Sequence, residues 1–132
     1  MRKLSLEHVF GCSTIHRHSI IGLPDNRVGF LAGSYLVILD CLTNEQRYLS
    51  FSSIEYISIS TSGLIMSIID RFNQDGDTRI YLYSTKPIAL LFTIEPDRFG
   101  NFIGMTINTT DNLIMILHNA PAYMITIREY ND

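Results

Sequence analysis

The chain has 132 residues, a length that fits one domain with a single hydrophobic core. It is 46% hydrophobic and 17% charged, with a mean hydropathy of +0.15, so it is too apolar for a disordered chain and lacks the long apolar run of a membrane-spanning helix. Its net charge of -3 and pI near 5.7 argue against a nucleic-acid-binding protein, because that role depends on clustered Lys and Arg.

The N-terminal residues and the two cysteines give little indication of function. The chain begins with basic residues but reaches Glu7 and His8 before a hydrophobic segment of signal-peptide length develops, which predicts a cytoplasmic protein. Its two cysteines, Cys12 and Cys41, are expected to be reduced thiols, with a disulfide as the alternative, and they define no metal site. Residues 4–10 can form one extended strand, and they are the candidate for a strand that closes the fold from the N-terminus.

Short runs rich in Ile, Leu, Val, Tyr and Phe follow, separated by Gly, Asn, Asp, Ser and Pro. This pattern is typical of strands joined by tight turns. Residues 19–51 form a first unit of four predicted strands. These strands are Ser19 to Leu23, Val28 to Ala32, Tyr35 to Asp40 and Gln46 to Phe51.

The same order recurs in residues 54–94 and begins a third time in residues 102–127, where only three strands are predicted. The strands of the second unit are Glu55 to Ser60, Leu64 to Asp70, Thr78 to Tyr83 and Ile88 to Ile94. Those of the third unit are Phe102 to Asn108, Leu113 to Leu117 and Ala122 to Ile127, with a turn at His118-Asn119-Ala120-Pro121. Residues 1–132 are therefore interpreted as a single domain built from repeated units.

Four-strand units at roughly 40-residue spacing are typical of radially packed propeller blades. Alternation at Ile57 and Ile59, and at Ile103, Met105 and Ile107, indicates one buried face. The strands at Tyr35 to Leu39 and at Tyr81 to Tyr83 are instead apolar on both faces, as expected where sheet packs on sheet. The sequence therefore predicts an all-β fold of about three four-stranded antiparallel blades in an incomplete ring. Closed propellers usually have about four to eight blades, so the apolar faces and strand edges at both ends need a cover.

Candidate metal sites are weak. His16 and His18 lie two apart, so on a strand both side chains would point to one side, but no third ligand is indicated and exposed loop residues explain them better. Asp70, Asp75 and Asp77 surround a glycine and are similar to an oxygen-rich calcium loop. They lack the spacing and the closing Glu of an EF-hand, and a polar hairpin loop with Asp-Gly turn chemistry explains the same residues.

Catalytic motifs are not found either. Ser13, Ser34 and Ser53 lie in no Gly-x-Ser-x-Gly elbow, and Cys12 lies beside no recognisable partner for a nucleophile. The sequence therefore predicts no catalytic residues, no cofactor-binding residues, no metal ligands and no cofactor. The aromatic side chains are expected mainly in the core, with a partner surface as the alternative. They include Tyr48, Phe51, Tyr56, Phe92, Phe99, Phe102, Tyr123 and Tyr130.

Several stretches carry a resemblance to a known group. They are His8-Val9-Phe10-Gly11, Phe30 to Ser34 leading into Tyr35 to Asp40, Ile57 to Ser60, and Thr78 to Tyr83. Through them the chain resembles the WD-repeat cilia- and flagella-associated proteins, most nearly the N-terminal propeller blades of that group. Leu39 and Asp40 stand where the usual hydrophobic-Asp dipeptide lies, although the chain contains no Trp.

The resemblance implies WD40-like blades and a non-catalytic scaffold of a ciliary or flagellar axoneme, where such proteins lie on doublet microtubules and help dock dynein-regulating assemblies. The partners it implies are tubulin, axonemal dynein-regulating proteins, or another chain that completes the propeller, with no nucleic acid and no membrane. A second hypothesis is a small β-barrel or sandwich, unrelated to cilia, that binds a ligand or another protein, since strands and turns alone do not separate these folds. A third, an enzyme, would need a cleft with convergent polar groups.

Overall fold

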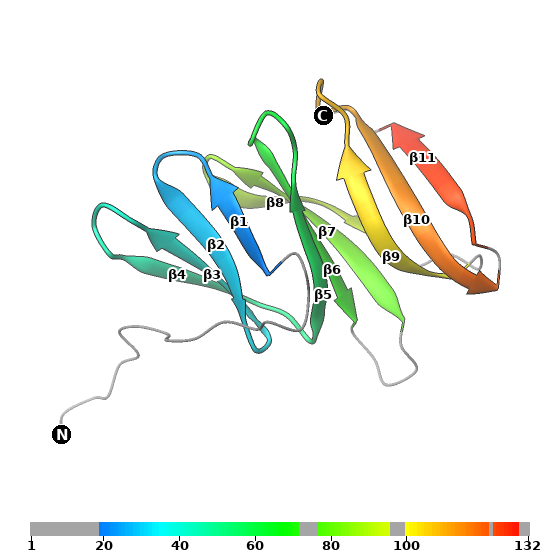
Figure 1. The fold of residues 1–132 in the computed structure, drawn as a ribbon, viewed down its shortest axis with the longest axis horizontal. Coiled ribbons are helices and arrows are strands. Elements are labelled where there is room, and N and C mark those ends of the chain that lie inside the picture. Colours follow the sequence, from blue (N-terminus) through cyan, green and yellow to red (C-terminus); the bar gives the residue numbers. More distant parts are fainter. Residues whose placement is uncertain (1–18, 72–76, 96–99, 122, 130–132) are drawn as a thin grey trace.

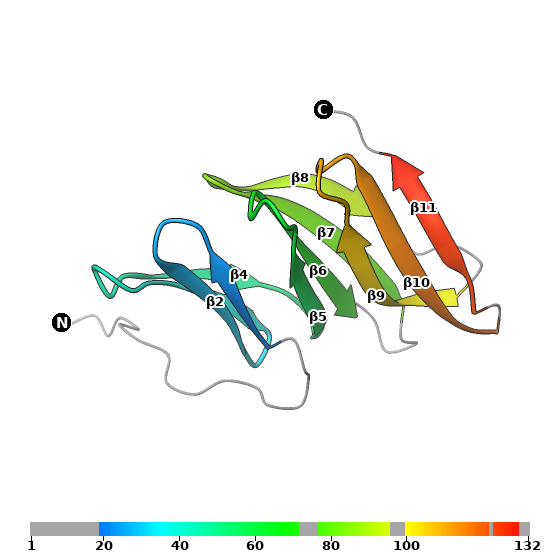
Figure 2. The same cartoon turned by 45° about the horizontal axis from the view of Figure 1, so that its top comes forward.

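The structure is a computed structural model that describes residues 19–71, 77–95, 100–121 and 123–129. The described residues form eleven strands in three antiparallel sheets, and the sheets lie one beside the next in chain order (Figure 1). The turned view in Figure 2 shows the same three sheets still separate. This confirms the predicted all-β fold of propeller blades in an incomplete ring.

Each sheet is a simple meander in which neighbouring strands are consecutive in the sequence. The first sheet contains β1 (Ile20–Leu23), β2 (Arg27–Ala32), β3 (Tyr35–Asp40) and β4 (Gln46–Ser50). The second contains β5 (Ile54–Ile59), β6 (Ile65–Arg71), β7 (Thr78–Thr85) and β8 (Ile88–Ile94). The third contains β9 (Gly100–Ile107), β10 (Leu113–Pro121) and β11 (Ile125–Glu129).

Two sequence-based expectations need correction. The turn predicted at residues 118–121 is wrong, because β10 continues to Pro121 and pairs with β9 through two register shifts near His118. The burial of the His118 ring against Phe102 outweighs the turn propensity of the residues that follow it. The barrel or sandwich alternative is also wrong, because the described strands form three open sheets. The predicted strand at residues 4–10 lies outside the described residues.

The hydrophobic core consists of two layers, each between consecutive sheets. We define the front of a sheet as the face toward the next sheet along the chain, and the back as the opposite face. The first layer joins Ile21, Leu23, Leu31, Leu36 and Ile38 on the front of the first sheet to Ile54, Ile57, Met66, Ile68 and Ile88 of the second. The second layer joins Ile69, Ile80 and Leu82 on the front of the second sheet to Phe102, Met105, Ile107, Ile114 and Ile116 on the back of the third.

The second sheet is therefore buried on both faces, as predicted from the strand at Tyr81 to Tyr83. Ile68 and Ile69 on β6 point to opposite layers, and both are fully buried. For Tyr35 to Leu39 the same prediction holds only in part: Val37 is fully buried, but Tyr35 is 47% exposed and no described sheet packs on the back of the first sheet. Of the alternating residues on β9, Met105 and Ile107 are buried and Ile103 is exposed.

The first strand of each sheet contacts the first strand of the next, so that β1, β5 and β9 lie side by side (Figure 1). This radial order is that of propeller blades.

Polar groups hold the sheets in this order. The carboxylate of Asp70, at the end of β6, accepts hydrogen bonds from the backbone N–H groups of Ser52 and Ser53, which lie in the connection from the first sheet to the second. The Thr78 hydroxyl accepts a hydrogen bond of 3.0 Å from the Phe102 N–H and joins the second sheet to the third. Both Asp70 and Thr78 are buried, so these bonds form away from water.

The described part of the chain contains no helix of the length and apolar character needed to cross a membrane.

The turn between β3 and β4 is organised by Asp40. Its carboxylate accepts hydrogen bonds from the backbone N–H groups of Leu42 at 2.9 Å and Thr43 at 3.1 Å. These bonds, first that from Thr43, hold the pKa of Asp40 below the ordinary value of an aspartate. A carboxyl group whose folded-state pKa is depressed stabilises the fold above its unfolded pKa, and this contribution is lost as the pH falls through the folded pKa.

We therefore expect the Asp40→Asn variant to lose less stability on acidification than the wild-type chain. The measurement is the urea unfolding midpoint of both proteins from about pH 6 to about pH 3. Asp25→Asn serves as the control, because Asp25 is more than half exposed and lies in a surface ion pair with Lys86. Equal slopes for the wild type and Asp40→Asn would contradict the role of Asp40 as a hydrogen-bonded carboxylate.

Candidate interaction surface

The front of the third sheet is an apolar face that no described sheet covers. On β10, Leu113, Met115 and Leu117 alternate with the buried Ile114 and Ile116 and are therefore directed to the front. Each of the three is more than a third exposed: Leu113 37%, Met115 43% and Leu117 42%. A strand at the end of a stack is expected to alternate apolar and polar residues, so apolar residues at every position indicate a sheet made to be covered on both faces.

β11 and β9 extend the same face. Ile127 is paired with Met115 and is 63% exposed, and Ile125 is paired with Leu117 and is 59% exposed. On β9, Gly104 is paired with Leu117 and Thr106 with Met115. We call this surface the open face. It consists of Gly104, Thr106, Leu113, Met115, Leu117, Ile125 and Ile127.

The open face is not flat. Gly104 and Thr106 on β9 leave space beside the larger side chains of β10, and a Cβ atom added at Gly104 would meet nothing within 4 Å. A hollow of about 270 Å³ lies between Gly104, Leu117 and Ile125, and another of about 290 Å³ lies beside Leu113 and Ile127. Both hollows are lined mainly by apolar atoms, so the face is shaped to receive apolar side chains rather than a polar ligand.

The third sheet also ends in a free strand edge. It has three strands where each of the other two sheets has four, and among the described residues no strand pairs with the outer edge of β11. Such an edge presents backbone N–H and C=O groups that can pair with another strand. The open face and the β11 edge therefore lie together on one end of the molecule (Figure 1).

The back of the first sheet is the corresponding surface at the other end. Ile20 is 61% exposed and Tyr35 is 47% exposed, and the Tyr35 ring packs edge-on against Tyr48 at a centroid distance of 6.5 Å. Val28 and Phe30 of β2 share this face and are only partly buried. Both ends of the stack thus present apolar side chains, as an open array of blades requires.

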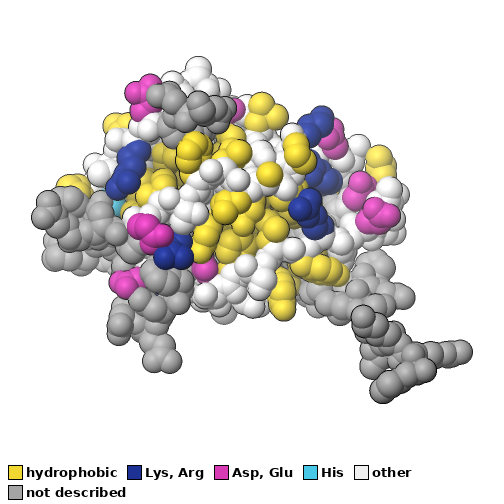
Figure 3. All heavy atoms as spheres, turned by 180° about the vertical axis from the view of Figure 1, so that it is seen from behind, with side chains coloured by type: hydrophobic (Ala, Val, Ile, Leu, Met, Phe, Trp, Pro, Cys, Tyr) yellow, Lys and Arg dark blue, Asp and Glu magenta, His cyan; other side chains and the backbone are white. Residues whose placement is uncertain are grey.

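A third apolar area lies on the middle of the molecule. The space-filling view from behind shows apolar side chains gathered there, with charged side chains toward the margins (Figure 3). On β8, the outermost strand of the second sheet, Leu90 is 51% exposed and Leu91 is 37% exposed. The pairing of β8 with β7 shifts register at Leu91, between the Leu82–Phe92 and Tyr83–Leu90 pairs. The two leucines therefore lie on an irregular part of a single strand, whereas the open face spans β9, β10 and β11.

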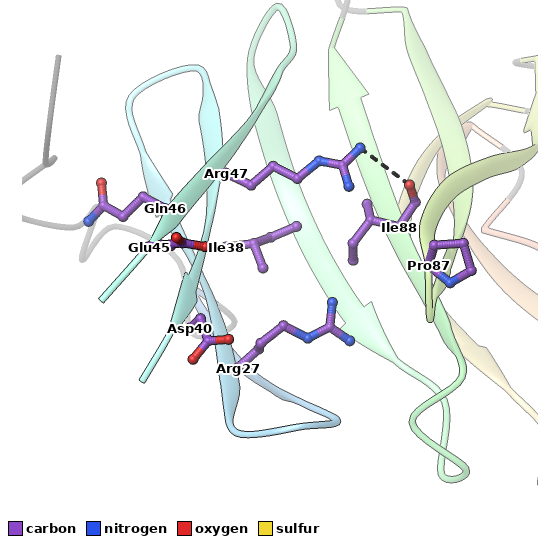
Figure 4. A pocket seen from close by; sticks show the side chains of 8 residues that line it. All are labelled: Arg27, Ile38, Asp40, Glu45, Gln46, Arg47, Pro87 and Ile88. Carbon is purple, nitrogen blue, oxygen red and sulfur yellow. Dashed lines mark hydrogen bonds between the residues drawn. The ribbon is translucent and has the colours of Figure 1, made fainter. Parts of the chain in front are cut away.

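One cleft, of about 310 Å³, contains charged side chains. It lies between the first two sheets and is lined by Arg27, Arg47 and Asp40 among others (Figure 4). Arg27 donates hydrogen bonds to the carbonyls of Pro24 at 3.0 Å and Thr85 at 2.6 Å. Arg47 donates to the carbonyl of Ile88 at 3.4 Å. The two guanidinium groups therefore join the first sheet to the second, and the lining of this cleft contains no Ser, Cys or His that could act as a nucleophile or base.

Within the described residues, the structure assembles no site from the candidates named in the sequence analysis. Asp70 points inward and holds the connection at Ser52 and Ser53, so it is a structural carboxylate rather than an open calcium ligand. The described residues include no group of three or more potential metal ligands. Cys41 is an exposed free thiol. Other candidates, His16, His18, Cys12, Ser13 and Asp75, lie outside the described residues.

The aromatic residues divide between core and surface. Phe102 is fully buried, and Phe51, Tyr56 and Phe92 pack against the two core layers, as predicted. Tyr123 is 75% exposed. Phe99 and Tyr130 lie outside the described residues. The open face contains no aromatic residue, so the aromatic side chains of the sequence did not indicate it. The sequence signal for this face is the unbroken apolar run at residues 113–117 in the last unit.

The architecture defines the chain as a partial β-propeller. It aligns with a chain in the crystal structure of the mitotic checkpoint complex with a TM-score of 0.60 at 12% identity, over 91% of this chain and 40% of that chain. It aligns with the β-propeller domain of the Trilobed protease from Pyrococcus furiosus, described as having an open velcro topology, with a TM-score of 0.51 at 11% identity, over 76% of this chain and 33% of that chain.

These similarities establish the fold alone, because the identities are 12% and 11%. The chain spans 40% of the first of these two chains and 33% of the second. No family model matches the sequence, and no curated protein sequence matches it. The β-propeller fold implied by the resemblance to WD-repeat proteins is therefore confirmed, and the comparisons contain nothing that bears on cilia.

Proposed function

We propose that this protein is a non-catalytic scaffold module that binds another protein β-sheet through the open face of its third sheet. The observation that carries this proposal is the exposure of Met115, Leu117, Ile125 and Ile127 on one continuous surface beside a free strand edge. Exposed apolar faces of this kind mark protein interaction sites in folded proteins. The partner that suits this surface is an apolar sheet face, since the hollows of the open face can accept aliphatic side chains and the β11 edge can form backbone hydrogen bonds.

A binding role is favoured over an enzymatic one. The two arginines that line the cleft between the first two sheets are engaged with backbone carbonyls of the second sheet, and the lining of this cleft contains no Ser, Cys or His. His118 is the only histidine in the described residues, and it is fully buried, with its Nε2 atom hydrogen-bonded to the Thr126 hydroxyl. A buried imidazole in the core of a sheet supports packing rather than turnover.

The test is a photo-crosslinking amino acid placed at Met115 of the full chain, followed by mass spectrometry of the products. Met115 lies at the centre of the open face, so we expect crosslinks to one recurrent protein sequence at this position. The same amino acid at Leu90, which is 51% exposed on β8, is the control and is expected to give no recurrent partner. Crosslinks of equal number and variety at both positions, or none at Met115, would contradict a specific interaction surface.

Substitution provides a quantitative measure of the same surface. We expect Leu117→Arg to weaken binding of the crosslinked partner by roughly 30-fold or more, because it places a charge in the centre of an apolar interface where hot-spot changes cost about 2 kcal/mol or more. The variant should remain folded, since Leu117 is 42% exposed. Isothermal titration of the wild type, Leu117→Arg and Leu90→Arg separates the open face from the rest of the surface.

The ciliary role is a narrower form of this proposal. It is supported by the resemblance of stretches such as Phe30 to Asp40 and Thr78 to Tyr83 to WD-repeat cilia- and flagella-associated proteins. In this form the partner is an axonemal protein, tubulin or a dynein-regulating protein among them, and the protein resides in the cytoskeleton of a cilium or flagellum. A tagged chain expressed in a ciliated cell should then recover axonemal proteins, and should recover fewer of them when it carries Leu117→Arg. Failure of the wild-type chain to recover axonemal proteins would remove the ciliary form and leave the general scaffold to the crosslinking test.

A further inference from the structure

We infer that the occupant of the open face is the back of the first sheet of a second copy of this chain, so that two copies close one six-bladed ring. This inference rests on the proposed function, because it names the partner of the same surface. It follows from the order in which the sheets already pack within one chain. The first layer joins the front of one sheet to the back of the next, and the second layer does the same.

This head-to-tail order leaves two surfaces unused among the described sheets. They are the front of the third sheet, which is the open face, and the back of the first sheet. A third layer of the same kind needs a front and a back, and the chain offers one of each. Contact between two open faces would instead join front to front, an arrangement that neither existing layer uses.

The residues on the two unused surfaces match those of the covered ones. On the front of the second sheet, Ile80 and Leu82 of β7 are fully buried by the third sheet. Ile125 and Ile127 lie on the corresponding strand of the third sheet, and they are 59% and 63% exposed. The open face thus has the chemistry of a covered front without its cover.

The backs show the same correspondence. On the back of the second sheet, Tyr81 and Tyr83 of β7 pack against the first core layer, and the Phe51 ring lies 5.4 Å from the Tyr81 ring. Tyr35 lies on β3, the corresponding strand of the first sheet, with the Tyr48 ring beside it, and it is 47% exposed. An aromatic side chain against aliphatic ones is therefore the combination already present in the first layer.

The number of sheets selects two copies. Closed propellers have about four to eight blades. The described residues of one chain contribute three sheets, so those of two copies supply six, which lies within that range, whereas those of three copies supply nine. A head-to-tail contact closes into a ring when the rotation between subunits allows it and otherwise forms an open filament. Two copies related by a two-fold axis form the third layer twice and leave neither end of the stack exposed.

The test begins with the mass of the full wild-type chain by light scattering over a wide range of protein concentration. We expect a particle of twice the 15.1 kDa chain mass that does not grow further. We expect Leu117→Arg on the open face and Tyr35→Arg on the back of the first sheet each to give a folded monomer, with the fold checked by circular dichroism. Leu90→Arg is the control, because Leu90 lies on neither end of the stack, and it should remain a dimer.

Mixing the two monomeric variants distinguishes a ring from other dimers. A mixed pair contains one contact in which both surfaces are altered and one in which both are native. We therefore expect Leu117→Arg and Tyr35→Arg to form a heterodimer when mixed, although neither dimerises alone. A dimer that persists in Tyr35→Arg but not in Leu117→Arg would show contact between two open faces and would overturn the ring. A mixture that stays monomeric would overturn it as well.

The remaining outcomes separate this inference from the proposed function. A wild-type chain that is monomeric throughout, or that forms a ladder of larger oligomers, overturns the two-copy ring. If the monomer nevertheless crosslinks to a different protein through Met115, the scaffold function stands and only the identity of the partner is wrong. If the monomer crosslinks to nothing, both proposals fail.

Discussion

Replacing Asp70 with alanine is expected to lower the free energy of unfolding by about 3 kcal/mol, since hydrogen bonds to charged groups contribute about 1.5 to 3 kcal/mol each. The Asp70 carboxylate is 2% exposed and accepts bonds from the N–H groups of Ser53 at 2.7 Å and Ser52 at 3.1 Å. Alanine removes both acceptors from the connection that joins the first sheet to the second. Urea unfolding at a fixed protein concentration measures the effect.

Two variants control for this result. Asp70→Asn keeps one acceptor oxygen in nearly the same volume, so its free energy of unfolding should lie between those of the wild type and Asp70→Ala. Asp25→Asn removes the ion pair with Lys86, whose two side chains are 53% and 58% exposed, and asparagine tolerates the φ of 62° at this position, so this change should cost less than about 1 kcal/mol. If Asp70→Ala unfolds no more easily than Asp25→Asn, the carboxylate does not hold the two sheets together.

The Leu82→Ala change is expected to cost about 2 to 5 kcal/mol, because Leu82 is fully buried in the second core layer and its truncation leaves a cavity between two sheets that cannot collapse freely. The matched control lies on the adjacent strand. Leu90→Ala removes the same atoms from a side chain that is 51% exposed and should change stability by less than about 0.5 kcal/mol.

The difference between these two leucine variants tests the position of the sheets directly. It depends on the burial of Leu82 by the third sheet and on the exposure of Leu90, since both residues belong to the second sheet. Thermal or urea unfolding of the two variants under identical conditions gives the comparison. Similar losses for Leu82→Ala and Leu90→Ala would mean that the second layer is not packed as described.

The strands were largely predictable because their signals are local. Tyr35–Asp40 and Ile88–Ile94 begin and end where the sequence predicts, since apolar β-formers lie between residues that favour turns. At Gly33 the backbone adopts a φ of 63°, a conformation that glycine permits without strain, and the turn between β2 and β3 follows from it. The end of β10 was not predictable, because Asn119 and Pro121 favour a turn locally while pairing with β9 keeps the strand extended.

The candidate surface could be predicted only in part. An incomplete array must leave apolar ends, and the sequence indicated that these ends need a cover. It did not indicate which side chains form them, because alternation along a strand does not say which of its two faces meets a neighbour. In the apolar run at residues 113–117, Ile114 and Ile116 became core and Met115 became surface only when the third sheet packed on the second.

The sequence by itself determined that this protein is a series of short antiparallel sheets, because strand and turn propensities act between neighbours along the chain. Only the tertiary structure decided that the aspartate at the end of β6 is a buried link between sheets rather than a metal ligand, since its partners lie 17 and 18 residues away. It also decided which face stays open. Burial depends on what packs across a sheet, and that contact joins residues far apart in the sequence.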